Sequence, residues 1–301
     1  MTIGVTRVFH LNVNCSDLER SLGFYRDLLG LQQGAHTVSP EQGGAAFGLE
    51  TVAWDAWIML DERGYDGVVL DLLEWKTPKP TGTPPVAAHH LGFGRLGFTA
   101  PDVDATYERM LAAGVRCLCE PHDVAIPGVP GVRVFVCADP DGTLLEVLGA
   151  PLRKFAFLTM NCSDLDRSIE FYESVAGFTA RARFSLGRSD GASLGLEGEV
   201  ESEMAHLDDP RGDGSFALDL VQWQAPGVAG SPSREANRLG AFRLALYTDD
   251  IDASYDALLA ADVPCWSPPA ELDMGPGIPP LRALLFDDPD GTVLELIQPP
   301  T

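Results

Sequence analysis

The hydrophobic pattern of the first 80 residues predicts a strand, then a helix, then further strands. Apolar and polar positions alternate over residues 8–13, with Phe9, Leu11 and Val13 on one face and His10 and Asn12 on the other. The next apolar residues recur at helical spacing between a Ser16 cap and a Gly30 stop: Leu18, Leu22, Tyr25 and Leu29. Runs at residues 57–60 and 68–75 predict strands, about three in all after the helix.

This order of elements occurs four times. Residues 14–18 (NCSDL) return at 161–165, and residues 139–143 (DPDGT) return at 288–292, so the chain is a tandem duplication. Within each half a weaker copy starts with a strand, at residues 96–98 and 244–247, and Pro- and Gly-rich connectors at 77–88 and 225–233 precede these copies. We predict two domains, 1–150 (modules 1–78 and 92–150) and 151–301 (modules 154–226 and 240–300).

Composition narrows the class of function. With 301 residues, 45% hydrophobic and 22% charged, the chain is long and apolar enough for two folded domains. Its 44 acidic and 21 basic residues give a net charge of −23, which disfavours nucleic acid and anionic membranes as partners. The chain contains neither a long apolar run nor a signal pattern, so we expect a cytoplasmic protein, a monomer or a homodimer, with a small-molecule ligand.

Two motifs carry a family resemblance. The segment SDLERSLGFY follows the first predicted strand, and DPDGTLLEV lies near the end of the first half. With the duplicated βαβββ order, they resemble the vicinal oxygen chelate superfamily, which includes glyoxalase I, extradiol dioxygenases and bleomycin-resistance proteins. The resemblance covers nearly the whole chain. It implies an α+β fold in which two modules curve a mixed sheet around a cup, with helices on the outer face.

In metal-using members of this family, the ligands come from the first and last strands of each module, because a side chain opposite the helix-packed face points into the cup. The first-strand position lies seven residues before the Asp that precedes each helix, and it holds His10, Arg95, Phe157 and Arg243. The last-strand position is assigned to Glu74, Glu146, Gln222 and Glu295.

Two ways of pairing the modules remain open. Pairing within halves groups His10 with Glu74, Arg95 and Glu146, and leaves Phe157, Gln222, Arg243 and Glu295 for the second cup. Pairing across halves instead joins His10 and Glu74 to Arg243 and Glu295, and joins Phe157 and Gln222 to Arg95 and Glu146.

The resemblance makes a metal site one possibility. His10 with Glu74 and Glu146 is a legitimate ligand set for one divalent Fe, Mn, Zn or Ni ion, whereas Phe157 offers no lone pair. Arg95 and Arg243 depart from the family pattern, which has His, Gln or Glu there. Each arginine could instead form a bidentate pair with the neighbouring Glu, either as a structural pair or as a binding site for a substrate oxygen.

Three functions therefore compete. The first is lyase, isomerase or dioxygenase-type chemistry on a small oxygenated or aromatic molecule, with His10, Glu74, Arg95 and Glu146 as catalytic residues. The second is metal-free binding or sequestration of such a molecule, as in drug-resistance relatives. The third divides the labour between one catalytic and one structural half, because His10 and Glu74 have Phe157 and Gln222 as their counterparts.

Overall fold

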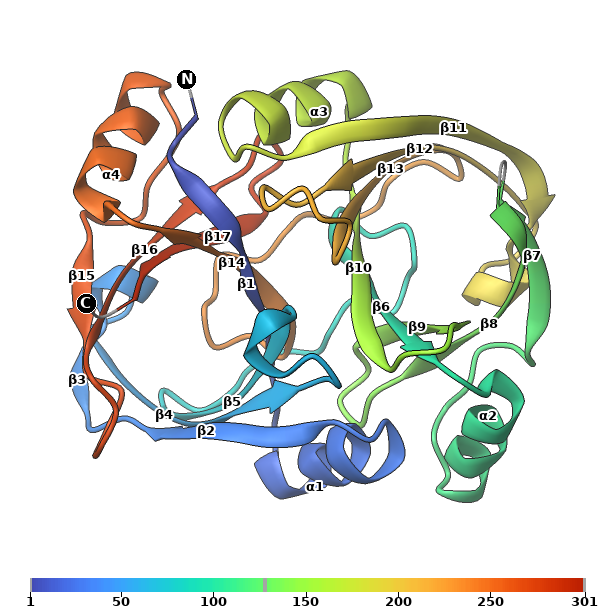
Figure 1. Ribbon diagram of the computed structural model, residues 1–301, viewed down its shortest axis with the longest axis horizontal. Helices are drawn as coiled ribbons and strands as arrows, with labels where there is room; N and C mark the ends of the chain where they lie inside the picture. The colour runs from blue at the N-terminus through green and yellow to red at the C-terminus, as the bar shows by residue number, and fades with distance from the viewer. Residues whose placement is uncertain (1, 127–128, 300–301) are drawn as a thin grey trace.

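The structure, a computed structural model, describes residues 2–126 and 129–299 and consists of two curved mixed sheets with four α-helices (Figure 1). Sheet I has the spatial order β15 (Ala270–Leu272), β16 (Leu281–Asp287), β17 (Val293–Gln298), β14 (Gly240–Thr248), β1 (Val5–Asn14), β5 (Val69–Thr77), β4 (Thr51–Leu60) and β2 (Gln32–Val38), with β3 (Gln42–Gly43) paired to β4. Sheet II has the order β11 (Thr179–Asp190), β12 (Glu199–Asp208), β13 (Ala217–Ala225), β10 (Lys154–Asn161), β6 (Gly92–Ala100), β9 (Leu144–Gly149), β8 (Val129–Ala138) and β7 (His122–Ile126). The predicted α+β fold is confirmed.

Each sheet combines one module from each half of the chain. In sheet I, β1 of the first half pairs antiparallel with β14 of the second, and in sheet II β6 pairs in the same way with β10. Of the two pairings left open by the sequence, the protein forms the one across halves. The boundary near residue 150 therefore separates sequence repeats, whereas each sheet includes residues from both sides of it.

The two connectors hold this arrangement together. Connector 1 (residues 78–91) and connector 2 (residues 226–239) exchange backbone hydrogen bonds in two symmetry-related places. Thr81 donates to the Asn237 carbonyl at 3.0 Å and accepts from Leu239 at 2.9 Å. In the matching position, Ala229 donates to the His89 carbonyl at 3.0 Å and accepts from Leu91 at 2.8 Å. Residues far apart in the sequence are thus joined at the place where the two halves cross.

Two buried asparagines from the repeated NCSDL motif secure the connectors. Asn14 donates from Nδ2 to the carbonyls of Ala236 and Arg238, both at 2.8 Å, and its Oδ1 accepts the Trp75 indole N–H at 2.9 Å. Asn161 repeats this arrangement: its Nδ2 donates to the carbonyls of Ala88 (2.9 Å) and His90 (2.7 Å), and its Oδ1 accepts the Trp223 indole N–H (2.8 Å). Each half therefore binds the connector of the other half.

An aspartate begins each helix: α1 (Leu18–Leu22, continued by a π-helical turn over Gly23–Leu28), α2 (Val103–Ala112), α3 (Leu165–Ser174) and α4 (Ile251–Ala260). Asp17 accepts the Arg20 N–H at 3.0 Å, as is typical of an N-cap. The predicted Ser16 cap is therefore one residue too early. The Ser16 hydroxyl instead donates to Asp141 at 2.6 Å. None of the helices in residues 2–126 and 129–299 is both long and apolar enough to cross a membrane.

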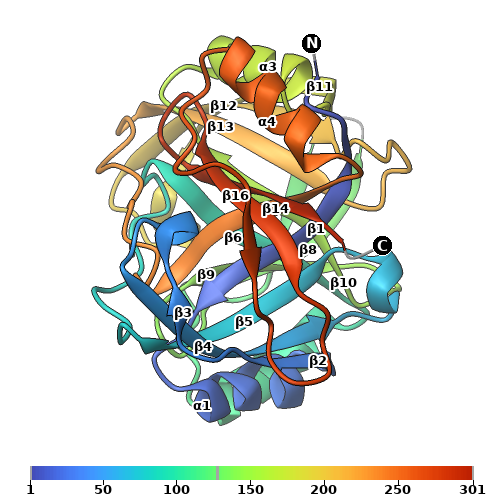
Figure 2. The ribbon, with the colours of Figure 1, turned by 90° about the vertical axis from the view of Figure 1, so that its left-hand side faces the viewer.

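Apolar side chains form one layer on each face of sheet I. On the convex side, a core shared by all four modules includes Leu11, Val13 and the buried apolar residues of the helices. Figure 2 shows α3 and α4 together at one end of the molecule and α1 at the other. On the concave side, which we call cup I, a second core surrounds Trp54 and Trp75. The concave side of sheet II is called cup II.

The strand parity predicted for β1 holds from His10 onward and fails at Phe9. An irregularity in the pairing with β14 lies between Val8 and His10, and it turns Val8 toward the convex core and Phe9 toward cup I. A bulge of this kind shifts the alternation by one residue. Phe9 then stacks on Tyr247 with ring centroids 4.2 Å apart.

Candidate functional site

Four charged or titratable side chains from adjacent strands converge in cup I. His10 comes from β1, Asp71 from β5, Arg243 from β14 and Glu295 from β17. Arg243 donates from Nε to Glu295 at 2.8 Å and from Nη2 to Asp71 at 2.9 Å. His10 Nε2 lies 3.2 Å from Glu295 Oε2 and 3.9 Å from Asp71 Oδ2. Arg243 thus bridges two carboxylates, with the imidazole beside them.

This cluster is almost completely shielded from solvent. The exposed fractions are 5% for His10, 6% for Asp71, 4% for Arg243 and 2% for Glu295. Burial acts to raise the pKa of Glu295, but the charges of Arg243 and His10 outweigh it and hold this pKa below its usual value. His10 Nδ1 and Arg243 Nη1 are buried without a hydrogen-bond partner in the described part of the chain. Both atoms therefore keep a hydrogen-bonding capacity that no described residue uses.

The prediction that Glu74 faces the cup is wrong. Glu74 lies three residues after Asp71 on β5, so alternation places it on the opposite face of the sheet. There its Oε2 accepts the Leu18 N–H at 3.1 Å, at the start of α1. Asp71 takes the inward position instead. The signal was present in the sequence, since Asp71 interrupts the apolar pattern between Leu70 and Leu72.

Gln222 is misplaced for the same reason. Its side chain accepts the Leu165 N–H at 3.0 Å, at the start of α3, outside cup II. The inward residue of β13 is Asp219, whose Oδ1 lies 2.7 Å from Nδ1 of His206 on β12. Neither Asp219 nor His206 was found from the sequence. Period-two alternation through β13 would have identified Asp219. His206 lies on β12, and the family resemblance places site residues only on the first and last strands of each module.

Cup II also contains the second arginine pair. Arg95 Nε donates to Glu146 at 2.8 Å. Phe157 pairs with Gly97 in the β10–β6 register, and its ring occupies the space that a Cβ on Gly97 would take. The structure therefore places Arg95 and Glu146 with Phe157, and it places Arg243 and Glu295 with His10. The predicted group of His10, Glu74, Arg95 and Glu146 does not come together.

A divalent metal does not fit these sites as they are built. In cup I, His10, Asp71 and Glu295 are suitable ligands, but the Arg243 guanidinium bonds both carboxylates at the point where a cation would bind, and like charges repel. The predicted trio does not come together, since His10 lies in cup I, Glu74 at the start of α1 and Glu146 in cup II. Within residues 2–126 and 129–299, no three His, Cys, Asp or Glu side chains are grouped to hold a metal ion.

Replacing Glu74 tests this assignment. We expect Glu74→Ala to lower the free energy of unfolding by about 1 kcal/mol, because it removes a helix-capping acceptor. Asp71→Ala should cost about 3 kcal/mol, because Arg243 then loses a buried carboxylate partner. Urea denaturation measures both values. Equal losses for the two variants would contradict the assignment of Asp71 to the cup and of Glu74 to the helix.

The titration of His206 is a second test. The hydrogen bond to Asp219 raises the pKa of His206 in spite of partial burial, while burial raises the pKa of Asp219. The contribution of the protonated imidazole to stability is therefore present below its unfolded pKa and is lost as the pH rises through the raised value. In Asp219→Asn we expect the pKa of His206 to fall. NMR titration of the imidazole ring measures this pKa. An unchanged His206 titration would show that the pair does not form.

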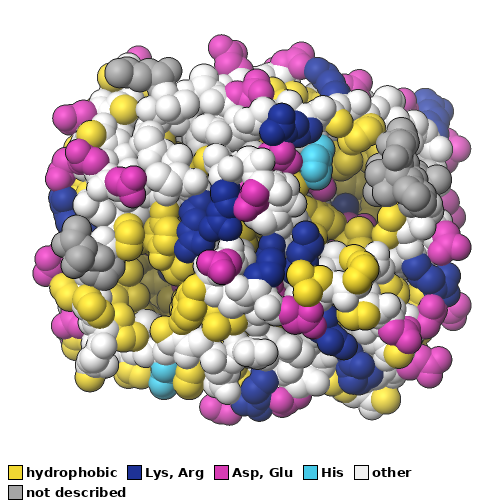
Figure 3. Space-filling view, in the orientation of Figure 1, with side chains coloured by type: hydrophobic (Ala, Val, Ile, Leu, Met, Phe, Trp, Pro, Cys, Tyr) yellow, Lys and Arg dark blue, Asp and Glu magenta, His cyan; other side chains and the backbone are white. Residues whose placement is uncertain are grey.

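The surface in Figure 3 is hollowed on both sides of its centre, with apolar side chains around both hollows. This view has the orientation of Figure 1, in which sheet I lies on the left and sheet II on the right. Each hollow lies on the side of one of the two sheets.

Comparisons with known proteins agree with this architecture. A lactoylglutathione lyase of Arabidopsis thaliana is 28% identical over 177 residues, which cover 57% of this chain and 54% of that protein, so the chain spans about half the length of this curated relative. The crystal structure of glyoxalase I from Zea mays matches the fold with a TM-score of 0.68 at 19% identity, over 97% of this chain and 92% of that one. The family model of the Glyoxalase/Bleomycin resistance protein/Dioxygenase superfamily matches residues 7–147 and 154–296. The chain belongs to this superfamily.

Proposed function

We propose that cup I binds a small, neutral, oxygen-bearing aromatic molecule without a metal ion. The observation that carries this proposal is the position of Arg243, which donates to both Asp71 and Glu295. Two carboxylates outnumber the single guanidinium, so the cluster favours a neutral ligand over an anion. A carbonyl or hydroxyl oxygen could accept from Arg243 Nη1 and pair with His10 Nδ1, which have no other partner among the described residues.

Under this proposal the partly exposed rings of Phe9 and Tyr247 supply the remaining contact surface, and the buried rings of a core cluster support them. Phe47 makes edge contacts with Trp54 and Trp75, with ring centroids 6.0 and 5.4 Å apart. The stacked pair of Phe9 and Tyr247 lies next to the His10 ring, whose centroid is 5.2 Å from that of Phe9. Planar ligands gain most from such rings, and a few polar groups then fix their orientation.

Proton transfer by His10 is the second candidate, and a specific contact favours it. Glu295 lies 3.2 Å from His10 Nε2, and a carboxylate beside one imidazole nitrogen orients the other nitrogen for acid–base work. The lyase activity named for the Arabidopsis relative is a precedent for chemistry in this fold. Here His10 would remove a proton from carbon next to a ligand carbonyl, and Arg243 would stabilise the developing charge on its oxygen.

Paired probes test the binding proposal. Acetophenone has a carbonyl group where ethylbenzene has a methylene group. We therefore expect acetophenone alone to raise the melting temperature, by about 5 °C when its free concentration is a hundred times its Kd. His10→Phe, which copies the residue of cup II, should remove this difference. Equal shifts from both probes would overturn the proposal. So would one tightly held metal ion per chain that is lost in His10→Phe.

The same ligand separates binding from proton transfer. Exchange of the acetophenone methyl protons with deuterium, followed by NMR in D₂O, should be faster with the parent protein than with His10→Phe if His10 is a base. Thermal stabilisation without exchange assigns cup I to binding alone.

A further inference from the structure

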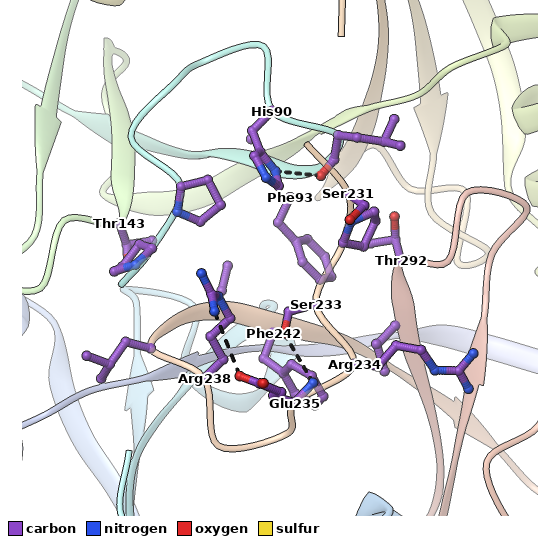
Figure 4. Close-up of a pocket in the computed structure, with 18 of the residues that line it drawn as sticks. His90, Phe93, Thr143, Ser231, Ser233, Arg234, Glu235, Arg238, Phe242 and Thr292 are labelled. Atoms are coloured by element: carbon purple, nitrogen blue, oxygen red, sulfur yellow. Dashed lines mark hydrogen bonds and ion pairs between the residues drawn. The ribbon is translucent and has the colours of Figure 1, made fainter. Parts of the chain in front are cut away.

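A cavity lies outside both cups, between the two sheets. It has a volume of about 370 Å³, which is within the range of small-molecule sites. Connectors 1 and 2 form most of its wall, and the starts of β6, β9, β14 and β17 complete it. Figure 4 shows Arg234, Glu235 and Arg238 on one side of this cavity, His90 on the opposite side and Phe93 between them.

The charged side of the cavity comes from connector 2 alone. Its cations are Arg234 and Arg238, whereas connector 1 contributes Pro84, Pro85 and His90. Arg234 already has partners, because its Nη1 lies 2.9 Å from buried Asp287 and its guanidinium lies over the Trp266 ring. The cavity thus combines a largely apolar wall with a cationic one.

The Arg238 side chain is held in place, but it makes no side-chain hydrogen bond to any other described residue. A Cβ added to Gly82 would lie 2.7 Å from Arg238 Nη1, so the guanidinium rests against the backbone of connector 1. Its one ionic neighbour among the described residues is Glu235, 3.8 Å away and largely exposed. This distance is too long for a hydrogen bond, and a guanidinium can make bidentate bonds to a carboxylate.

Two buried hydroxyls add polar groups without partners. Thr143 and Thr292, the last residues of the two DPDGT copies, line the cavity and are 4% and 1% exposed. Neither side-chain oxygen has a hydrogen-bond partner within the described residues. Buried hydroxyls are usually satisfied, so unpaired hydroxyls in a cavity wall indicate a place for a polar ligand.

We infer that this cavity binds a small carboxylate with an apolar body, anchored by Arg238. The carboxylate takes the bidentate position on the guanidinium that Glu235 approaches but does not fill. The apolar body lies against Phe93, Phe242 and the connector prolines. This ligand is anionic, in contrast to the neutral ligand proposed for cup I, and the site needs no part of the His10 cluster.

Opposite effects of two neighbouring substitutions test the inference. Benzoate, phenylacetate and hexanoate are titrated into the whole protein by calorimetry, with phenylacetamide as the uncharged counterpart of phenylacetate. We expect at least one carboxylate to bind and phenylacetamide not to bind. Arg238→Gln should weaken the carboxylate about tenfold. Glu235→Gln should tighten it about threefold, because a competing carboxylate is removed.

Three controls separate this site from general charge effects and from cup I. Glu170→Gln on the exposed face of α3 changes the net charge equally and should leave the affinity unchanged. His10→Phe should also leave it unchanged, so this inference and the proposed function can fail separately. Ser231→Trp should block binding by filling the cavity from its rim. Failure of all three carboxylates to bind, or equal binding by Arg238→Gln and the parent, would overturn the inference.

Discussion

Arg243→Met is expected to lower the free energy of unfolding by about 3–5 kcal/mol at pH 7, because it leaves Asp71 and Glu295 as buried carboxylates without their cation. Urea denaturation with a two-state fit measures the loss. Arg95→Met is the matched comparison in cup II. Among the described residues Arg95 has one carboxylate partner, and its side chain is more exposed, at 12% against 5% for Arg243, so we expect Arg95→Met to cost clearly less.

The loss in Arg243→Met should depend on pH in a defined direction. In the parent the pKa of Glu295 is lowered, so its contribution to stability is present above its unfolded pKa and is lost as the pH falls through the folded value. The variant lacks this contribution. The difference in stability between parent and variant should therefore shrink below about pH 4.5. A difference that stays constant down to pH 4 would show that Arg243 acts through packing alone.

Asn14→Ala is expected to cost about 3–5 kcal/mol of unfolding free energy, since it removes three hydrogen bonds from a fully buried side chain. Asn161→Ala removes the equivalent three bonds and should cost a similar amount. Chemical denaturation of the two variants gives both values. Asn14→Asp keeps the acceptor for Trp75 and loses the two donors, so it reports how much the connector contacts contribute.

Limited proteolysis distinguishes the two asparagines. Asn14 binds connector 2 and Asn161 binds connector 1, so each variant should become sensitive to cleavage in a different connector. Mass spectrometry of the fragments should locate new cuts within residues 226–239 for Asn14→Ala and within residues 78–91 for Asn161→Ala. Cleavage at the same connector in both variants would contradict the crossed arrangement of the halves.

The two cups have diverged in the partners of their inward carboxylates. In cup I, Asp71 pairs with Arg243 and the cluster is closed to solvent. In cup II, Asp219 pairs with His206, a side chain that is 39% exposed, while Arg95 pairs with Glu146. The difference follows from single positions, because Ile58 occupies the place in the β4–β5 register that His206 occupies in β12–β13. The duplication therefore gives one buried ionic cluster and one more open one.

The sequence by itself determined the repeat, the order of elements in each module and the inward orientation of His10, Arg95, Arg243, Glu146 and Glu295. These follow from local rules: repeated motifs mark equivalent positions, and alternation within a strand sets the face of each side chain. Glu74 and Gln222 were misassigned because the alternation along their strands was not followed. It places Asp71 and Asp219, three residues earlier, on the inward face. Phe9 was misassigned because a bulge depends on the partner strand, which its own segment does not specify.

Only the tertiary structure decided which modules share a sheet. Both pairings satisfy the same strand pattern and bury the same kinds of side chain, so nothing local distinguishes them. The choice rests on contacts between residues more than 200 positions apart, such as Asn14 with the carbonyls of Ala236 and Arg238. The same crossing places Arg243 beside His10 and encloses the cavity between the connectors. Hydrogen bonds to backbone carbonyls leave no side-chain signature at the accepting end, and this is why the sequence did not reveal them.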